Sequence, residues 1–375
     1  MGKIDIVEVE SSSDLNRFID YPNQLYAGDP NYVTPLKMER KAFFDTRKNP
    51  FYRLAKTRLF LAERDDRVVG RIATCIDYNY IDLHEEQVGF FGFFDCEDDY
   101  EAASSLLKVA MIELKRQGME KMRGPFNFST NHECGFLVDG FDSPPVIMMT
   151  YNKPYIPRLV EKFGLKKAMD LLAYKMTKDS PVSDRIRKIA AKQQERSSVK
   201  LRSLDMKNFS EEVEKVRQVY NQAWQHNWGF VPLSEEEFDH IAADLKQVVD
   251  PDLVIIAEHE DKPVAFLMAV PDLNQALIHL KGRLFPIGIF KLLWHTKIRN
   301  KVNGVRIITM GVIPEYQKRG IDSMMYIKCY DTGLGKGYQW GEMSWILETN
   351  ELMRNAAEQL GAVLYKRYRI VEMPL

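Results

Sequence analysis

The sequence has few cysteines, no membrane-length apolar run and almost no net charge. Its four cysteines (Cys75, Cys96, Cys134 and Cys329) form no CxxC pair and its seven histidines are dispersed, so we expect neither a metal site nor a disulfide framework. No segment approaches the roughly 18 apolar residues of a bilayer-spanning helix. A net charge of −1 excludes a general nucleic-acid binder, which needs a basic surplus.

The N-terminus also lacks targeting features. "MGKIDIVEVE" carries charges throughout and no cleavage site, so we do not expect it to be a signal peptide. Ile6 stands where a myristoylation motif has Ser or Thr. With thiols suited to a reducing compartment, these features predict a cytoplasmic protein. A chain of 375 residues that is 45% apolar and 28% charged has the size and composition of two globular domains.

The two halves of the sequence share one order of predicted elements. Residues 58–77 and 253–270 each consist of an apolar run, a charged turn and a second apolar run, which predicts a β-hairpin. Each hairpin is followed by a strand and then by an apolar-periodic helix that ends near a glycine, Gly118 or Gly337.

Both halves also close in the same way. "YIPRLVEKFGLKKAMDLLAYKM" and "ELMRNAAEQLGAVLYKRYRIVEM" each predict a helix, a C-terminal glycine and a strand. The polar segment 180–200 predicts a linker or a connecting helix. We therefore predict two similar α/β domains, at 1–178 and 200–375, joined by residues 179–199, and we favour duplication over convergence.

The stretch "GVIPEYQKRGID" (311–322) predicts a strand, a basic turn and a helix start. Successive backbone amides in such a turn, together with the helix N-terminus, form an anion-binding site. Lys318 and Arg319 add positive charge for phosphates. A tight surface turn with no ligand is the alternative interpretation.

This stretch and the later "NELMRNAAEQLGA" resemble the GNAT acyltransferase superfamily, and the whole chain is similar to a tandem-GNAT protein. The family's acyl-CoA loop has the pattern Gln/Arg-x-x-Gly-x-Gly/Ala, followed later by an Asn-led helix. The resemblance implies two mixed sheets flanked by helices, and acetyl-CoA or another acyl-CoA as co-substrate. The implied CoA-binding residues are Val312, Gln317, Lys318, Arg319, Gly320, Ile321, Asp322 and Asn350.

Asp322 departs from the family pattern, because the loop has Gly or Ala at that position. Its carboxylate either repels the pyrophosphate or caps its own helix, and we expect weakened binding that is not abolished. The matching stretch of the first half, "DDYEAA" (98–103), has three acids and no glycine. We therefore expect only the second domain to bind acyl-CoA.

Acyl transfer to an amine requires a polarised carbonyl, a base and an acid. The resemblance implies that the backbone of strand 306–312 polarises the carbonyl. Ala357 stands where many relatives carry a tyrosine acid. Glu348 and His226 are the candidate bases, against a solvated strand-end role for Glu348. The candidate acids are Tyr316, Tyr326 and Tyr330, against a packing role for all three.

Trp224, Trp228 and Phe230 are candidates for the acceptor pocket, with core packing as the alternative. The turn-rich segment 124–145 has no counterpart in the second half and is given no role. Segment 282–302 mixes apolar and basic residues. We favour packing within the protein, over an acyl-chain cover or membrane contact.

Three hypotheses follow. The first is an N-acyltransferase that transfers an acetyl group to a small amine or to an amino-terminal group. The second is a CoA-binding or partner-binding module whose catalysis has lapsed, which Asp322 and Ala357 suggest. The third is a peripheral membrane adaptor that uses residues 282–302. The oligomeric state does not follow from the sequence.

Overall fold

The computed structural model describes residues 2–225, 227–284, 288 and 302–375. By packing, the chain divides into two units. The first comprises Met1–Leu171, Asn274–Ile298 and Lys366–Leu375, and the second comprises Leu172–Leu273 and Arg299–Tyr365. Strands β7 (Lys166–Thr177) and β13 (Val363–Pro374) contribute residues to both units.

Apart from the last one, which comes from the second half of the sequence, the other described elements of the first unit form one repeat. They are β1 (Asp5–Glu8), α1 (Ser12–Leu25), α2 (Lys37–Phe43), η1 (Pro50–Arg53), β2 (Ala55–Arg64), β3 (Arg67–Asp77), α3 (Tyr78–His84), β4 (Val88–Cys96), α4 (Tyr100–Arg116), β5 (Lys121–Gly124), β6 (Phe136–Asp139), α5 (Ile156–Phe163) and α9 (Asn274–Leu277).

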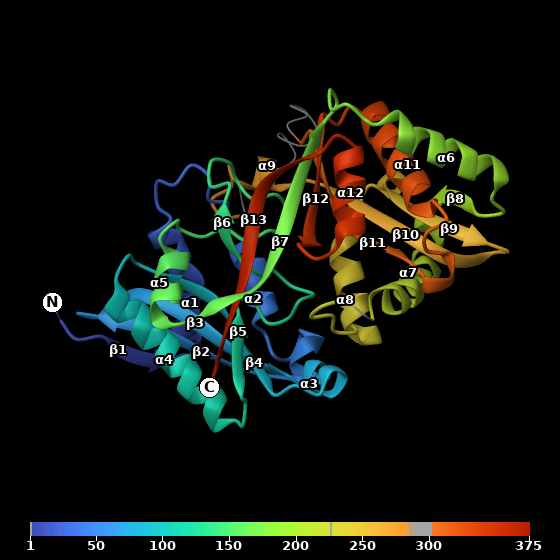
Figure 1. Cartoon of the computed structure of the whole chain (residues 1–375). Coiled ribbons are helices and arrows are strands. Elements are labelled where there is room, and N and C mark those ends of the chain that lie inside the picture. The colour runs from blue at the N-terminus through green and yellow to red at the C-terminus, as the bar shows by residue number, and fades with distance from the viewer. Residues whose placement is uncertain (1, 226, 285–287, 289–301) are drawn as a thin grey trace. The chain divides into compact units, whose positions relative to one another are not determined.

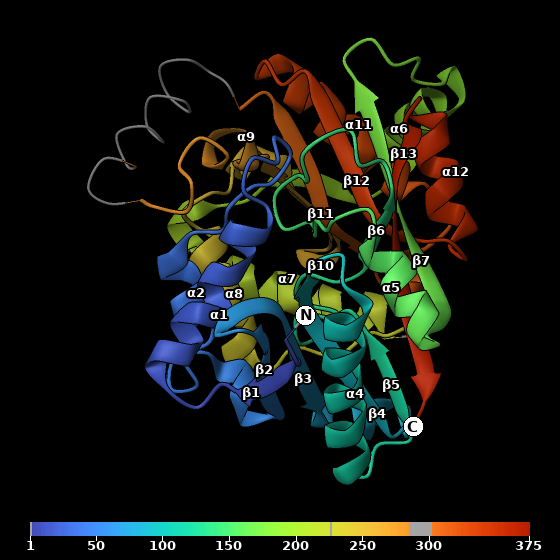
Figure 2. The same cartoon turned by 90° about the vertical axis from the view of Figure 1, so that its left-hand side faces the viewer.

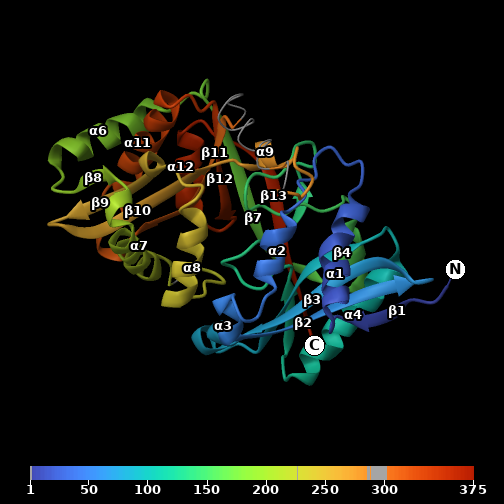
Figure 3. The same cartoon turned by 180° about the vertical axis from the view of Figure 1, so that it is seen from behind.

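The sheet of the first unit has the strand order β1-β2-β3-β4-β5-β13, with β6 also paired to β13. Its first four strands are antiparallel, and β4 and β5 are parallel. The last residues of the chain lie beside β5, with Val371 opposite Gly124 (Figure 2). Helix α4 covers one face of this sheet (Figure 1), and α1 and α2 lie on the other face (Figure 3).

The second unit repeats this order. Its described elements are α6 (Asp184–Arg196), β8 (Lys200–Ser203), η2 (Met206–Asn208), α7 (Phe209–Trp224), α8 (Glu235–Leu245), η3 (Pro251–Leu253), β9 (Val254–His259), β10 (Lys262–Pro271), β11 (Gly304–Val312), η5 (Pro314–Tyr316), α11 (Ile321–Gly335), β12 (Trp340–Leu347) and α12 (Glu351–Gln359).

The strands of the second unit are ordered β12-β11-β10-β9-β8, and β11 and β12 are parallel. Consecutive strand residues point to opposite faces of a sheet. In β9, Ile255 belongs to the core under α11, whereas Ile256 belongs to the core under α7. The sheet is therefore covered on both faces, with α6 packed beside α11 (Figures 1 and 3).

The predicted α/β repeats, both hairpins and both closing helices are confirmed. Each hairpin turns through two consecutive residues with positive φ, Asp65-Asp66 (51° and 61°) and Glu260-Asp261 (50° and 61°). This is the primed-turn geometry that suits the twist of paired strands. The helix alternative for segment 180–200 is also confirmed, since α6 fills most of it.

Packing units and sequence repeats are different divisions of a chain. The predicted repeat boundaries, at 178 and 200, therefore stay a prediction. Most of segment 282–302, residues 285–287 and 289–301, lies outside the described residues. At its start, the carbonyl of Gly282 accepts a hydrogen bond from the amide of Lys37 at 3.1 Å. Within the described ranges, no helix combines the length and the apolarity that a membrane crossing needs.

Candidate acyl-CoA site

The basic turn between β11 and α11 has the geometry of an anion-binding loop. Lys318 (φ 59°) and Gly320 (φ 79°) both lie in the left-handed region, which is strained for a lysine. Gln317 fixes the turn by donating from Nε2 to the carbonyl of Val312 at 3.0 Å. Gly320 is the N-cap of α11, and no side chain caps this helix. The first amides of α11 are therefore left for an external acceptor.

Asp322 lies in the first turn of α11 and does not cap it. Its carboxylate makes no hydrogen bond with any described residue, and the N-cap position belongs to Gly320. The capping interpretation of Asp322 is therefore wrong for this structure. A half-buried carboxylate beside an open helix N-terminus lowers the positive potential there without filling the site.

Strands β11 and β12 separate immediately in front of this loop. Their parallel pairing runs only from Gly304 opposite Trp340 to Ile307 opposite Met343, although both strands continue. A register shift against β10 leaves Ile308 as a bulge at the same point. Beyond it, residues 308–312 have β10 on one side and no paired strand on the other within the described chain. Their backbone groups on that side face the split.

Two buried charges lie at the base of this split, and neither was expected from the sequence. Arg306 is 0% exposed and Glu342 is 1% exposed, and they are register partners across β11 and β12. Arg306 donates from Nε to Ser344 Oγ at 2.8 Å, and its guanidinium lies 4.8 Å from the ring centre of Trp345. Glu342 accepts a hydrogen bond from the hydroxyl of Tyr365. The sequence did contain a signal for them, because each is a charged residue within an otherwise apolar predicted strand.

The backbone near these charges is irregular. Trp345 has φ 51°, an uncommon conformation for a bulky residue within a strand. Its indole Nε1 and the hydroxyl of Thr309 are buried, and neither has a hydrogen-bond partner among the described residues. Unsatisfied buried polar atoms and local strain both point to a functional region.

Helix α7 places Trp224, one of the predicted acceptor residues, against the same strand. Trp224 donates from Nε1 to the carbonyl of Met310 at 3.1 Å, so its indole lies on β11 beside the split. Phe230 is buried, and its ring lies 5.7 Å from that of Tyr220. Trp228 is half-buried in the turn after α7. His226 lies outside the described residues, so its role as a base stays a prediction.

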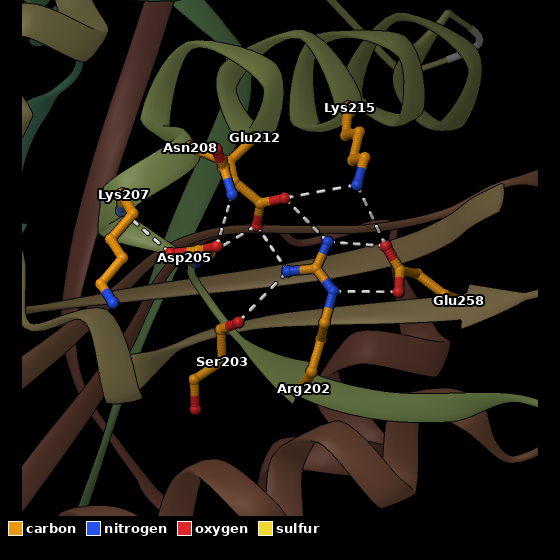
Figure 4. Close-up of polar contacts among 8 residues, drawn as sticks. All are labelled: Arg202, Ser203, Asp205, Lys207, Asn208, Glu212, Lys215 and Glu258. Carbon is orange, nitrogen blue, oxygen red and sulfur yellow. Dashed lines mark hydrogen bonds and ion pairs between the residues drawn. The ribbon is translucent and has the colours of Figure 1, made fainter. Parts of the chain in front are cut away.

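A charge network anchors the N-terminal part of α7 to the sheet (Figure 4). Arg202 on β8 binds Glu258 on β9 through two hydrogen bonds of 2.9 and 2.6 Å. It also binds Glu212 on α7, through both of its terminal nitrogens. The hydrogen bonds from Arg202 lower the pKa of Glu258. Burial alone would raise the pKa of Glu212, but Arg202 holds it below the ordinary value.

The remaining predicted residues lie around β12 and α12. Glu348 is half-buried, one residue beyond the end of β12. Asn350 is the N-cap of α12 and accepts from the amide of Met353 at 3.1 Å. Ala357 is buried in the core under α11 and takes no part in proton transfer.

The three tyrosines considered as acids all have other partners. The hydroxyl of Tyr316 lies 2.8 Å from His259 Nδ1. Tyr330 donates to the carbonyl of Lys178 at 3.2 Å. Tyr326 is buried beside Met353, and burial raises its pKa well above the ordinary value. A packing role therefore explains Tyr326, and nothing places the other two at the split.

The chain is similar to two known proteins over almost its whole length. No family model matches the chain. Protein YghO of Escherichia coli (strain K12) is 38% identical over 367 residues, which cover 96% of this chain and 93% of that protein. The bacterial ceramide synthase of Caulobacter vibrioides (strain NA1000 / CB15N) is 38% identical over 380 residues, which cover 99% and 98%.

A solved structure gives the fold. The tandem GNAT protein from the clavulanic acid biosynthesis pathway superposes with a TM-score of 0.57 at 9% identity, covering 99% of this chain and 98% of that one. At such low identity the similarity establishes the fold alone.

Proposed function

This chain belongs to the family of protein YghO and the bacterial ceramide synthase and has the tandem GNAT fold, and from that premise we propose that it is an acyl-CoA-dependent N-acyltransferase. One observation carries the proposal: the uncapped N-terminus of α11 lies directly after the strand that separates from β12. An anion-binding loop next to unpaired strand backbone matches a ligand with a phosphate end and an amide-bearing arm. Acyl-CoA has both parts.

In the proposed complex, residues 317–322 bind the pyrophosphate, and the backbone of 308–312 faces the pantetheine arm and the thioester. The acceptor nitrogen attacks the thioester carbonyl carbon, and the C–S bond breaks after a C–N bond has formed. The nitrogen loses one proton and the departing thiolate gains one. Backbone amides at the split stabilise the developing oxyanion.

The structure adds Glu342 to Glu348 and His226 as a candidate base. Glu342 is a buried carboxylate on the strand that borders the split, and Tyr365 orients it. We expect Glu342→Gln to lower kcat at least tenfold while the Kd for acyl-CoA changes little. The parallel variant Glu348→Gln distinguishes the two glutamates, since only the base loses turnover without losing donor binding.

Turnover tests the proposal directly. The protein is incubated with acetyl-, octanoyl- and palmitoyl-CoA, each with a small amine, a peptide amino terminus or sphinganine. Release of free CoA thiol and formation of the amide, detected by mass spectrometry, are the readouts. Amide formation that is lost in Gly320→Leu supports the proposal. Tight acyl-CoA binding without any amide identifies the lapsed binding module instead.

A second candidate concerns the size of both substrates. Acetyl transfer to a small amine is the simplest GNAT reaction, but the name of the ceramide synthase relative favours a different pair. A ceramide is the amide of a fatty acid with a long-chain amino alcohol. If this chain shares that chemistry, palmitoyl-CoA with sphinganine outpaces acetyl-CoA with a small amine in the same panel.

A further inference from the structure

Helix α6 presents a basic stripe that the proposed function does not use. Arg185, Lys188, Ile189 and Lys192 line an open hollow of about 340 Å³. Their spacing of three, four and seven residues places them on one face of the helix. The three cationic side chains are all exposed.

This face of α6 adjoins the anion-binding loop. A Cβ atom placed on Gly320 would lie 3.1 Å from Ile189 Cγ2 and 3.8 Å from Gln193 Cβ. Ile189 is itself one of the residues that line the hollow. The hollow therefore lies next to the open N-terminus of α11, and both belong to the second unit.

The cations at this site are not neutralised by carboxylates of the described chain. Arg185, Lys188 and Lys192 form no ion pair with any described residue, and neither do Lys318 and Arg319 in the loop. By contrast, Arg187, on another side of α6, pairs with Asp331 at 3.4 Å. Five unpaired cations near one helix N-terminus repel each other, and a bound polyanion relieves that repulsion.

We propose that the stripe of Arg185, Lys188 and Lys192 binds the 3′-phosphate of coenzyme A. The inference rests on the proposed function, because it takes the pyrophosphate to lie on residues 317–322. The 3′-phosphate and the 5′-pyrophosphate are attached to one ribose, so a second phosphate site must lie close to the first. A phosphate monoester carries almost two negative charges and accepts charge-assisted hydrogen bonds from Arg and Lys.

Helix α6 connects the two repeats in the chain. If its basic stripe binds the 3′-phosphate, this connecting helix is also part of the donor site. The stripe would select coenzyme A over donors that end in pantetheine or lack the 3′-phosphate.

Calorimetry with an acyl-CoA and its 3′-dephospho form tests the inference. We expect the wild-type protein to bind the 3′-phosphorylated donor at least about tenfold more tightly, an effect that shrinks as salt rises. The triple variant R185Q/K188Q/K192Q is expected to bind both donors with the weaker affinity. The control K200Q/K207Q/K262Q removes the same charge from exposed lysines of the second unit and is expected to keep the preference.

Each other outcome overturns the inference in a recognisable way. Equal affinity of the wild-type protein for the two donors removes the 3′-phosphate site but leaves the proposed function standing. Failure to bind either donor removes both. Loss of binding to phosphatidylglycerol vesicles in the triple variant, with the donor preference intact, assigns the stripe to a lipid phosphate. Lys188→Glu is a second variant at an exposed position, and it must also lose the preference.

Discussion

The N-termini of α4 and α11 occupy the same place in the two repeats and are in opposite states. At α4, the carboxylate of Asp99 accepts from the amide of Glu101 at 2.9 Å, and Arg64 binds both acids. At α11, the N-cap is Gly320 and no side chain caps the helix. The first helix thus satisfies its own amides and neutralises its own acids, whereas the second leaves its amides for a ligand.

The places where two parallel strands separate also differ between the repeats: one is occupied by the chain and the other is open. In the first unit, β4 and β5 stop pairing after Phe90 and Arg123, as β11 and β12 do in the second. The chain then continues along β4 in the same direction: the amide of Phe126 donates to the carbonyl of Phe91 at 2.7 Å, and the amide of Phe93 donates to Asn127 Oδ1 at 2.8 Å. The segment 124–145 therefore begins by occupying the first split. In the first repeat, the chain itself occupies the place beside the strand that the second repeat leaves open.

The largest expected effect comes from displacing this segment. A Cβ on Gly92 would lie 1.8 Å from the carbonyl oxygen of Phe126, which is backbone and cannot rotate away. We expect Gly92→Ala to lower the free energy of unfolding by about 3 kcal/mol, measured by urea denaturation. Gly335→Ala is the control, since its Cβ meets nothing within 4 Å and helix propensity favours Ala by about 1 kcal/mol. Equal stability of Gly92→Ala and wild type would show that the segment is not held against β4.

The next effect compares one glutamate in each repeat. Two residues before the hairpin turn, Glu63 pairs with Arg17 at 2.7 Å and Glu258 pairs with Arg202 at 2.6 Å. Arg202 also holds the buried Glu212, so we expect Arg202→Met to destabilise by about 2 kcal/mol. Arg17→Met breaks a pair of similar exposure but leaves no acid as buried as Glu212 without this partner, so it is expected to cost less than about 1 kcal/mol.

The Arg202 network also predicts a pH dependence. Arg202 holds the pKa values of Glu212 and Glu258 in the folded protein below the ordinary glutamate value of 4.5. Their contribution is therefore present above about pH 4.5 and is lost as pH falls from there through the folded pKa values. The wild-type protein should lose stability over this range more steeply than Arg202→Met. Parallel curves for the two proteins would contradict the role given to Arg202.

A smaller effect is expected when the N-termini of α4 and α11 are altered in turn and the affinity for acyl-CoA is compared. In Gly320→Leu, a side chain enters a left-handed position beside Ile189, and we expect the Kd for acyl-CoA to rise at least about tenfold. Asp99→Ala removes the cap of α4 and is expected to lower stability by about 1 kcal/mol without changing the Kd. Calorimetry that finds equal losses of affinity in both variants would refute a single site.

The smallest effect concerns Asp322. Because this carboxylate does not cap α11, we expect Asp322→Asn to tighten acyl-CoA binding by up to about 1 kcal/mol at low salt. The gain should shrink as the salt concentration rises, since ions screen the repulsion. Unchanged or weaker binding at low salt, titrated on folded protein, would mean that Asp322 assists the loop.

The hairpins, the helix ends and the loop could be predicted from the sequence, because local chemistry determines them. Apolar runs around charged turns indicated both hairpins, and Gly164 and Gly361, both with positive φ, end the two closing helices as expected. The loop 317–322 followed from its glycine and its cations. Asn350 was placed correctly at the start of α12, where it is the N-cap.

Long-range pairing could not be predicted in this way. Nothing local places Val371 opposite Gly124, or brings Arg306 and Glu342 together at the base of a split. The composition of segment 124–145 indicated a loop. It did not indicate that the segment pairs with β4, from which the whole of α4 separates it in the chain. The basic stripe of α6 could be linked to the anion-binding loop only through its contact with Gly320, which is distant in the chain.

Hydrogen exchange of the full chain, with and without an acyl-CoA, tests most directly which repeat is the open one. Backbone amides that bind the donor exchange more slowly in its presence. We predict slower exchange at residues 308–312 and 318–323, and no change at 90–96 and 99–103, where the chain already satisfies its own groups. Protection at 90–96 or 99–103, with none at 318–323, would contradict the account.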